Sequence, residues 1–116
     1  MNNQVLFPEV DQVEHSEDTF TLSLTIPETV YYFSGHFPQA PILPGVVQVH
    51  WALHYLNKHF AMQVSDYKTI DALKFQVIIA PNYQLKLCLK KLNENKFSFS
   101  YSSDHGNHSS GRVVYQ

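Results

Sequence analysis

The 116-residue sequence lacks the features of disulfide-rich, secreted and membrane proteins. It contains one cysteine, Cys88, which cannot form an internal disulfide and so favours a reducing compartment. No run approaches the roughly 18 apolar residues of a membrane span. The N-terminal residues also lack a basic region followed by a long apolar one. These absences predict a cytoplasmic protein that does not enter the membrane.

An excess of basic residues is missing as well. Eight Lys and Arg against ten Asp and Glu give a formal net charge of −2, and there is no basic tail. Nothing in this balance favours nucleic acid as a partner. The length suits a single domain, residues 1–116, which buries about two thirds of the surface exposed by its unfolded chain.

The most informative stretch that is present is SGHFPQAPILPGVVQVH, residues 34–50. Its three prolines fix φ and remove backbone donors, while Gly45 lets the chain approach another group closely, so the stretch predicts a rigid loop. From Val46 onward the apolar residues recur at spacings of three and four, which predicts a helix. The first turn of such a helix leaves backbone N–H groups unpaired beside Gly45, and these favour a partly negative oxygen. The apolar stripe of this helix consists of Val46, Val49, Leu53, Leu56 and Phe60.

Elsewhere apolar and polar residues alternate, as is typical of strands with one buried face. The predicted strands lie around residues 10–13, 20–26, 73–79, 85–89, 97–101 and 112–115. Turns are predicted at 15–18, 81–82 and 93–95, and a longer loop at 104–111. This order predicts an α+β fold in which an antiparallel sheet curls around one long helix. Exposed strand edges and a mixed helix flank with Trp51 and Tyr55 predict a homodimer in which two sheets join.

Seven histidines are a high count for this length and fall into different settings. His15, His105 and His108 lie in predicted turns, where we expect them to be solvated. His59 lies near the end of the predicted helix, where a cation favours the helix dipole. His36 differs, because nothing local in the rigid loop would bury it.

His50 and His54 lie on one face of the predicted helix. His50 is at the edge of the apolar stripe, as either a hydrogen-bonded core group or a site residue. The spacing of four could in principle hold a metal, but the glutamate of the HExxH motif and a nearby cysteine or carboxylate cluster are missing. We therefore expect no metal and no cofactor.

The run GHFPQAPILPGVVQ resembles the signature of the hotdog-fold (3R)-hydroxyacyl-[acyl-carrier-protein] dehydratases, whose general form is GHFPxxPxxPGVxxxE. The predicted order of strands, loop and helix is also the hotdog order. The letters VVQVHWAL further resemble the branch found in aryl-polyene pathways. The matching residues are Gly35, His36, Phe37, Pro38, Pro41, Pro44 and Gly45.

The resemblance implies dehydration of a (3R)-3-hydroxyacyl thioester, carried on acyl carrier protein, to the trans-2-enoyl thioester. In this family the loop histidine acts as a base, and an acidic residue fourteen positions later, on the partner subunit's helix, completes the site. His36 matches the base, whereas the fourteenth position holds His50 instead of a carboxylate. The substrate-binding positions implied by the resemblance are Phe37, Pro44, Gly45, Val46 and His54.

The residues present can be assigned to the steps of this reaction. Neutral His36 takes a proton from C2 of the substrate, and a backbone N–H of Gly45 or Val46 holds the developing enolate oxygen. His50, if protonated, delivers a proton to the departing hydroxyl. We expect His36 and His50 to be the catalytic pair.

Two other functions stay open at this point, because one fold serves several activities. A hotdog thioesterase commonly uses a carboxylate on the helix, and no Asp or Glu lies between Val46 and Met62. A non-catalytic partner subunit of a dehydratase heterodimer would keep the loop and lose the acid.

An acidic carrier protein would favour a basic patch at the pocket mouth. The candidates are Lys86, Lys90, Lys91 and Arg112, which could equally form a solvated strand face.

Overall fold

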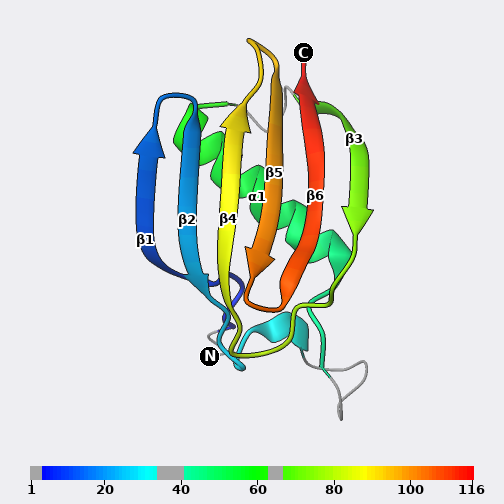
Figure 1. Cartoon of the computed structure of the whole chain (residues 1–116). Coiled ribbons are helices and arrows are strands. Elements are labelled where there is room, and N and C mark those ends of the chain that lie inside the picture. Colours follow the sequence, from blue (N-terminus) through cyan, green and yellow to red (C-terminus); the bar gives the residue numbers. More distant parts are fainter. Residues whose placement is uncertain (1–3, 34–40, 63–66) are drawn as a thin grey trace.

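The computed structural model describes residues 4–33, 41–62 and 67–116. One six-stranded antiparallel sheet, in the order β1-β2-β4-β5-β6-β3, is crossed on one face by a single long helix (Figure 1). This arrangement confirms the predicted α+β fold. The elements are β1 Glu9–Ser16, β2 Thr19–Thr25, the 3-10 turn η1 Tyr31–Phe33, α1 Gly45–Phe60, β3 Tyr67–Phe75, β4 Gln84–Lys91, β5 Lys96–Ser103 and β6 Gly106–Tyr115.

The sheet buries one face because its apolar residues meet across neighbouring strands. Leu87 on β4 pairs with Leu22 on β2 and Tyr101 on β5, and all three are fully buried. The residues between them point the other way, so that Cys88 pairs with Thr21 and Ser100 on the outer face. The alternation predicted for β2, β4 and β5 is therefore confirmed.

Helix α1 buries a different face from the predicted one. Val46, expected in the core, is 75% exposed, and Val49 and Leu53 are only partly buried. Trp51 and Tyr55, expected on a partner-facing flank, lie in the core of this chain. The prediction was wrong because it considered only aliphatic and Phe side chains. Side chains with polar atoms, such as Trp51 and Tyr55, can also be buried when those atoms are hydrogen-bonded. The buried residues of α1 are Val47, Gln48, Trp51, Ala52, Tyr55 and Leu56.

Two strand predictions are corrected by the structure. The strand predicted at 73–79 is the end of β3, which stops at Phe75, and residues 76–79 continue outside the named strands. The loop predicted at 104–111 is mostly strand, because β6 begins at Gly106 after a turn at residues 104–105. A register shift where β5 residues 101–102 pair with β6 places both His108 and Ser109 in the interior. Such a bulge breaks the alternation from which a strand is recognised.

Within residues 4–33, 41–62 and 67–116, no helix is both long enough and apolar enough to cross a membrane. The sheet has two edge strands, β1 and β3. Helix α1 runs diagonally behind the sheet, from the lower end of β3 to the upper end of β2 (Figure 1). The start of α1 and the end of β3 consequently lie close together.

The packing of β6 gives the first testable prediction. A Cβ added at Gly111 would lie 2.9 Å from Phe99 Cε2 and 3.3 Å from Leu73 Cδ1, and Phe99 is buried. Gly111→Ala should therefore lower the free energy of unfolding by about 1–3 kcal/mol through overpacking. Urea unfolding measures this loss. Ser110→Ala, on the outer face of the same strand, should stay within about 0.5 kcal/mol of the parent protein, and equal stability of the two variants would contradict the packing argument.

Candidate active site

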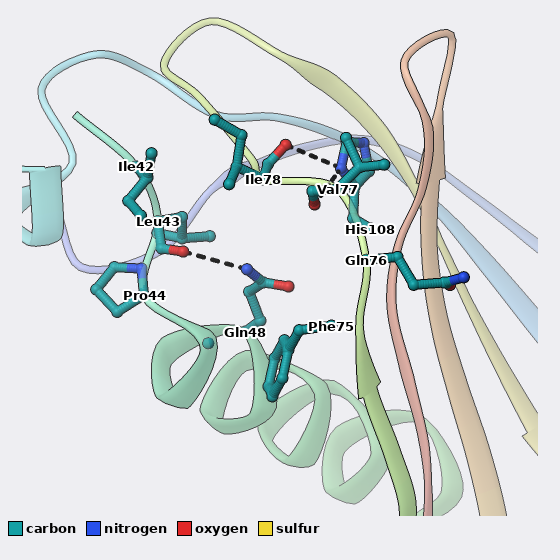
Figure 2. A pocket seen from close by; sticks show the side chains of 10 residues that line it. Ile42, Leu43, Pro44, Gln48, Phe75, Gln76, Val77, Ile78 and His108 are labelled. Atoms are coloured by element: carbon teal, nitrogen blue, oxygen red, sulfur yellow. Dashed lines mark hydrogen bonds between the residues drawn. The ribbon is translucent and has the colours of Figure 1, made fainter. Parts of the chain in front are cut away.

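A pocket of about 320 Å³ lies at the start of α1. Its walls are residues 42–45 before and at the helix start, residues 75–78 at and after the end of β3, and the side chains of Gln48 and His108 (Figure 2). The walls are mainly apolar, with a few polar groups from α1 and β6. Such a composition is typical of a small-molecule site.

Gly45 and Phe75 both line this pocket and lie in close contact. A Cβ at Gly45 would lie 2.7 Å from Phe75 Cε1, which is too close for any side chain unless the ring moved. The close approach predicted for Gly45 is therefore to the Phe75 ring. This contact holds the end of β3 against the first residue of α1.

The start of α1, where Gly45 lines this pocket, carries backbone donors. Pro44 caps the helix, and its carbonyl oxygen accepts the N–H groups of Val47 at 3.1 Å and Gln48 at 3.2 Å. The N–H groups of Gly45 and Val46 precede the first bonds inside the helix. The first turn contains no acidic side chain to neutralise the positive end of the helix dipole. The helix start is thus suited to binding a partly negative oxygen.

His50 and His54 lie elsewhere, on the exposed side of α1. The ring of Phe7 is 6.0 Å from the His50 ring and 4.6 Å from the His54 ring, centroid to centroid. Burial, followed by the charges of Lys58 and then His50, lowers the pKa of His54 below its ordinary value of 6.5. Neither imidazole lines the pocket of its own chain.

Of the other predicted site residues, Pro44 and Gly45 line the pocket, and Val46 is exposed beside it. His36 and Phe37 lie outside the described residues. In the part of the chain that the structure describes, no three His, Cys, Asp or Glu side chains gather as metal ligands.

His108 was expected in a solvated turn, and this expectation was wrong. Its side chain is 1% exposed, with Nδ1 3.0 Å from the carbonyl oxygen of Val77 and 3.1 Å from that of Ile78. Nε2 lies 2.6 Å from Ser103 Oγ. Because a carbonyl oxygen only accepts, Nδ1 carries a proton, and in the neutral imidazole Nε2 accepts from the Ser103 hydroxyl. His108 thereby holds the pocket wall that follows β3.

Gln48 is the second pocket residue that sequence reasoning missed. The pattern placed it on a mixed flank of the helix, but it is 4% exposed and hydrogen-bonded through both atoms of its side-chain amide. Only the surrounding structure supplies these partners. The one sequence signal was its place four residues after Pro44, in the first turn of the helix.

The predicted basic patch does not border this pocket. Lys86, Lys90 and Arg112 are exposed on strands whose buried residues alternate with them, so they lie on the outer face of the sheet. Lys91, the fourth predicted cation, is partly buried at the end of β4. Lys86 Nζ donates to Ser23 Oγ at 2.7 Å on that face. The geometry favours a solvated strand face for these cations.

Comparisons with known proteins agree with this architecture. The model of the ApeI-like family, described as ApeI dehydratase, matches residues 12–112. The 3-hydroxyacyl-[acyl-carrier-protein] dehydratase FabZ of Streptococcus pneumoniae is 34% identical over 83 residues, which cover 66% of this chain and 59% of FabZ. FabZ of Clostridium botulinum is 32% identical over 66 residues, 52% of this chain and 46% of that protein. The chain thus spans about half of these curated relatives.

Solved structures extend the likeness to nearly the whole chain. A chain of the dehydratase heterocomplex ApeI:P from Xenorhabdus doucetiae has a TM-score of 0.80 and 26% identity, covering 94% of this chain and 97% of that one. An uncharacterized protein from Erwinia carotovora subsp. atroseptica has a TM-score of 0.73 and 30% identity, covering 100% and 97%. These similarities confirm the predicted hotdog fold and the resemblance to dehydratases of the aryl-polyene type.

The histidines of α1 predict a pH-dependent stability. Burial is the main cause that lowers the pKa of both His54 and His59, so at mildly acidic pH the unfolded chain binds more protons at these sites. The free energy of unfolding should therefore be highest above pH 6.5, the ordinary pKa, and should fall as the pH decreases below it. The double variant His54→Gln, His59→Gln should lose less stability on acidification.

Urea unfolding of both proteins over mildly acidic to neutral pH measures this difference. Lys58→Gln, which removes the second-largest cause at both histidines, should reduce the slope in the same direction. Asn107→Gln, at an exposed position of β6, is the control and should keep the parental slope. Identical slopes for the parent and the double variant would refute the assignment.

Proposed function

The chain belongs to the family of ApeI-like dehydratases, and from this membership we propose that it removes water from a (3R)-3-hydroxyacyl thioester. The product is the trans-2-enoyl thioester, formed in fatty-acid or aryl-polyene biosynthesis. The FabZ relatives are named as dehydratases of 3-hydroxyacyl-[acyl-carrier-protein]. We propose the same carrier for the substrate of this chain.

The observation that carries the proposal is the pocket at the start of α1. Its apolar walls suit an acyl chain, and the N–H groups of Gly45 and Val46 suit the thioester oxygen. Charge develops on that oxygen when C2 loses its proton. Donors placed there before the reaction are often worth a few kcal/mol in the transition state.

The acid and the base are assigned to imidazoles. His36 takes the proton from C2, and the electron pair passes through the enolate to form the double bond as the C3–O bond breaks. His50 gives a proton to the leaving hydroxyl, which departs as water. The reaction is balanced, because one imidazole gains the proton that the other loses.

We place His50 in the site of the partner subunit. His50 is exposed on α1 and does not line the pocket of its own chain, which supports a role across an interface. In such an assembly each pocket takes its base from one chain and its acid from the other. The substrate-binding roles of Phe37, Pro44, Gly45, Val46 and His54 remain part of this proposal.

The edge formed by β3 is the proposed dimer surface. β3 is the last strand of the sheet, and Phe75 at its end is 51% exposed beside the exposed Val46, Leu73 and Ile78. An unpaired edge with apolar neighbours favours pairing with another chain. A second copy of this chain is the proposed partner.

A non-catalytic subunit is the second candidate function. α1 contains no Asp or Glu, and a solved structure with a TM-score of 0.80 is a dehydratase heterocomplex. In that case the purified chain would be inactive alone and active only with a related protein. A thioesterase has no support from α1, which lacks the carboxylate that hydrolysis in this fold commonly uses.

Three substitutions at two residues test the chemistry. His36→Ala and His50→Ala should each lower the rate of enoyl thioester formation by about 100-fold or more, since each removes a proton-transfer group. His50→Glu should keep activity and shift its pH profile. Mass spectrometry of a 3-hydroxyacyl chain on acyl carrier protein measures the conversion, with His105→Ala in the exposed β5–β6 turn as the control. Parental rates in either alanine variant would remove that residue from the mechanism.

Mixing the two inactive variants tests the shared site. If His36 and His50 come from different subunits, mixed dimers have one intact site. Statistical mixing makes half of the dimers mixed, so about one quarter of the parental rate should return. No recovery, with exchange of subunits shown by a tag, would place both histidines in one chain.

The dimer surface gives a further prediction. Val46→Asp should abolish the dimer, because a carboxylate would replace an apolar group that is 75% exposed in the single chain. The fold should persist, since an acidic side chain in the first helical turn is favourable. Sedimentation measures the mass. Leu92→Asp makes the same kind of change at an exposed position between β4 and β5, and this control should remain dimeric. A dimeric Val46→Asp protein would refute the placement of the interface.

A further inference from the structure

Gln48 connects the two sides of the pocket through one buried side chain. Its Nε2 donates to the carbonyl oxygen of Leu43 at 3.1 Å, and its Oε1 accepts from Ser109 Oγ at 2.6 Å. Leu43 belongs to the segment before α1, whereas Ser109 lies in β6. Figure 2 shows the amide of Gln48 directed at the Leu43 carbonyl across the pocket.

The peptide groups of Leu43 are held on both sides. Its N–H donates to the carbonyl oxygen of Ile79 at 2.8 Å, and its C=O accepts from Gln48. The next residue is Pro44, with φ of −60° restricted by its ring and ψ of 146°. The direction of the Gly45 N–H therefore depends on how Leu43 is held.

Gln48 itself is fixed from a third direction. Its backbone carbonyl accepts the hydroxyl of Tyr101 at 2.8 Å, and Tyr101 is fully buried in the core. The position of the Gln48 amide is thus set by α1, β5 and β6 together. Both polar atoms of the Gln48 side chain, Nε2 and Oε1, are hydrogen-bonded.

We propose that Gln48 is a positioning residue, which aims the N–H groups of Gly45 and Val46 at the thioester oxygen by holding the Leu43 carbonyl. This inference rests on the proposed function. A methionine of similar length would fill the same space without needing buried partners, whereas a buried amide costs free energy unless it is hydrogen-bonded. Burying the amide therefore costs more free energy than burying a methionine. Unlike methionine, the amide can hold the Leu43 carbonyl by a hydrogen bond. Small errors in the aim of such donors lower the rate strongly.

Three substitutions separate the parts of this arrangement. Gln48→Met removes both side-chain bonds and keeps the length. Gln48→Glu keeps an acceptor for Ser109 but sets a carboxylate oxygen against the Leu43 carbonyl. Ser109→Ala removes the other bond and leaves the bond to Leu43 in place. Ser110→Ala, the next residue on the outer face, is the control.

Steady-state dehydration kinetics should show a loss of turnover without a loss of substrate binding. Gln48→Met and Gln48→Glu should lower kcat by about ten- to a hundredfold, with KM within about threefold, because the held donors act mainly on the charge of the transition state. Ser109→Ala should lower kcat by less than either Gln48 variant, and Ser110→Ala should have the kcat of the parent. A kcat of Gln48→Met within twofold of the parent would overturn the proposal, as would a rise in KM alone. If Gln48→Met does not fold, Gln48→Glu decides by the same criteria.

Amide hydrogen exchange at Leu43 gives a second readout that does not depend on activity. Loss of the Gln48 bond should loosen the Leu43 N–H bond to Ile79, so this amide should exchange faster in Gln48→Met and at the parental rate in Ser110→Ala. If the parent protein has no dehydratase activity but Leu43 exchanges faster in Gln48→Met, Gln48 holds Leu43 and the proposed function is rejected. If the parent dehydrates its substrate and Gln48→Met leaves both kcat and the exchange rate unchanged, the positioning role of Gln48 is rejected and the proposed function stands.

Discussion

The structure depends on the hydrogen-bonded burial of one face of helix α1. This face carries polar groups, and it can pack on the sheet only because those groups find partners in the strands and in neighbouring segments. Trp51 Nε1 donates to the Leu6 carbonyl at 2.9 Å, and Asn57 Oδ1 accepts the hydroxyl of Tyr115 at 2.7 Å. Gln48 is bonded on both sides of its amide. Asn57 Nδ2 is the exception, buried without a partner within the described residues. These bonds fix the rotation of α1 about its axis, and the rotation sets the position of its first residue at the pocket.

The same rotation decides which helix residues are available to another chain. Because Gln48, Trp51 and Tyr55 turn inward, Val46, His50 and His54 are left on the outer side. The pocket and the exposed imidazoles therefore belong to different faces of one helix. An enzyme that needs both must bring the outer face of one α1 near the pocket of another chain. The proposed dimer and the proposed catalytic pair thus follow from one packing choice.

Sequence periodicity predicted the elements whose buried residues are apolar, and it failed where they are polar. The alternating Leu85, Leu87 and Leu89 were enough to predict β4, because each inward residue is a leucine. The first half of β6 has serine, glycine and histidine inside, at a bulge, and such residues give no apolar alternation. In the site, the periodicity after the proline-rich motif predicted a helix from Val46, one residue after its observed start at Gly45. Gln48 and His108 were missed because their burial depends on partners such as Ser109 and Val77, which are distant in the sequence.

The absence of a carboxylate on α1 changes the electrostatics of the proposed site. With a carboxylate, the positive helix start and a protonated base would be partly neutralised, whereas two imidazoles add no negative charge. The exposed side of α1 already shows the effect, since the charges of Lys58 and His50 help to lower the pKa of His54. A second proton on that face is disfavoured for the same reason. The proposed mechanism needs one neutral imidazole to take the proton from C2 and one charged imidazole to give a proton to the hydroxyl.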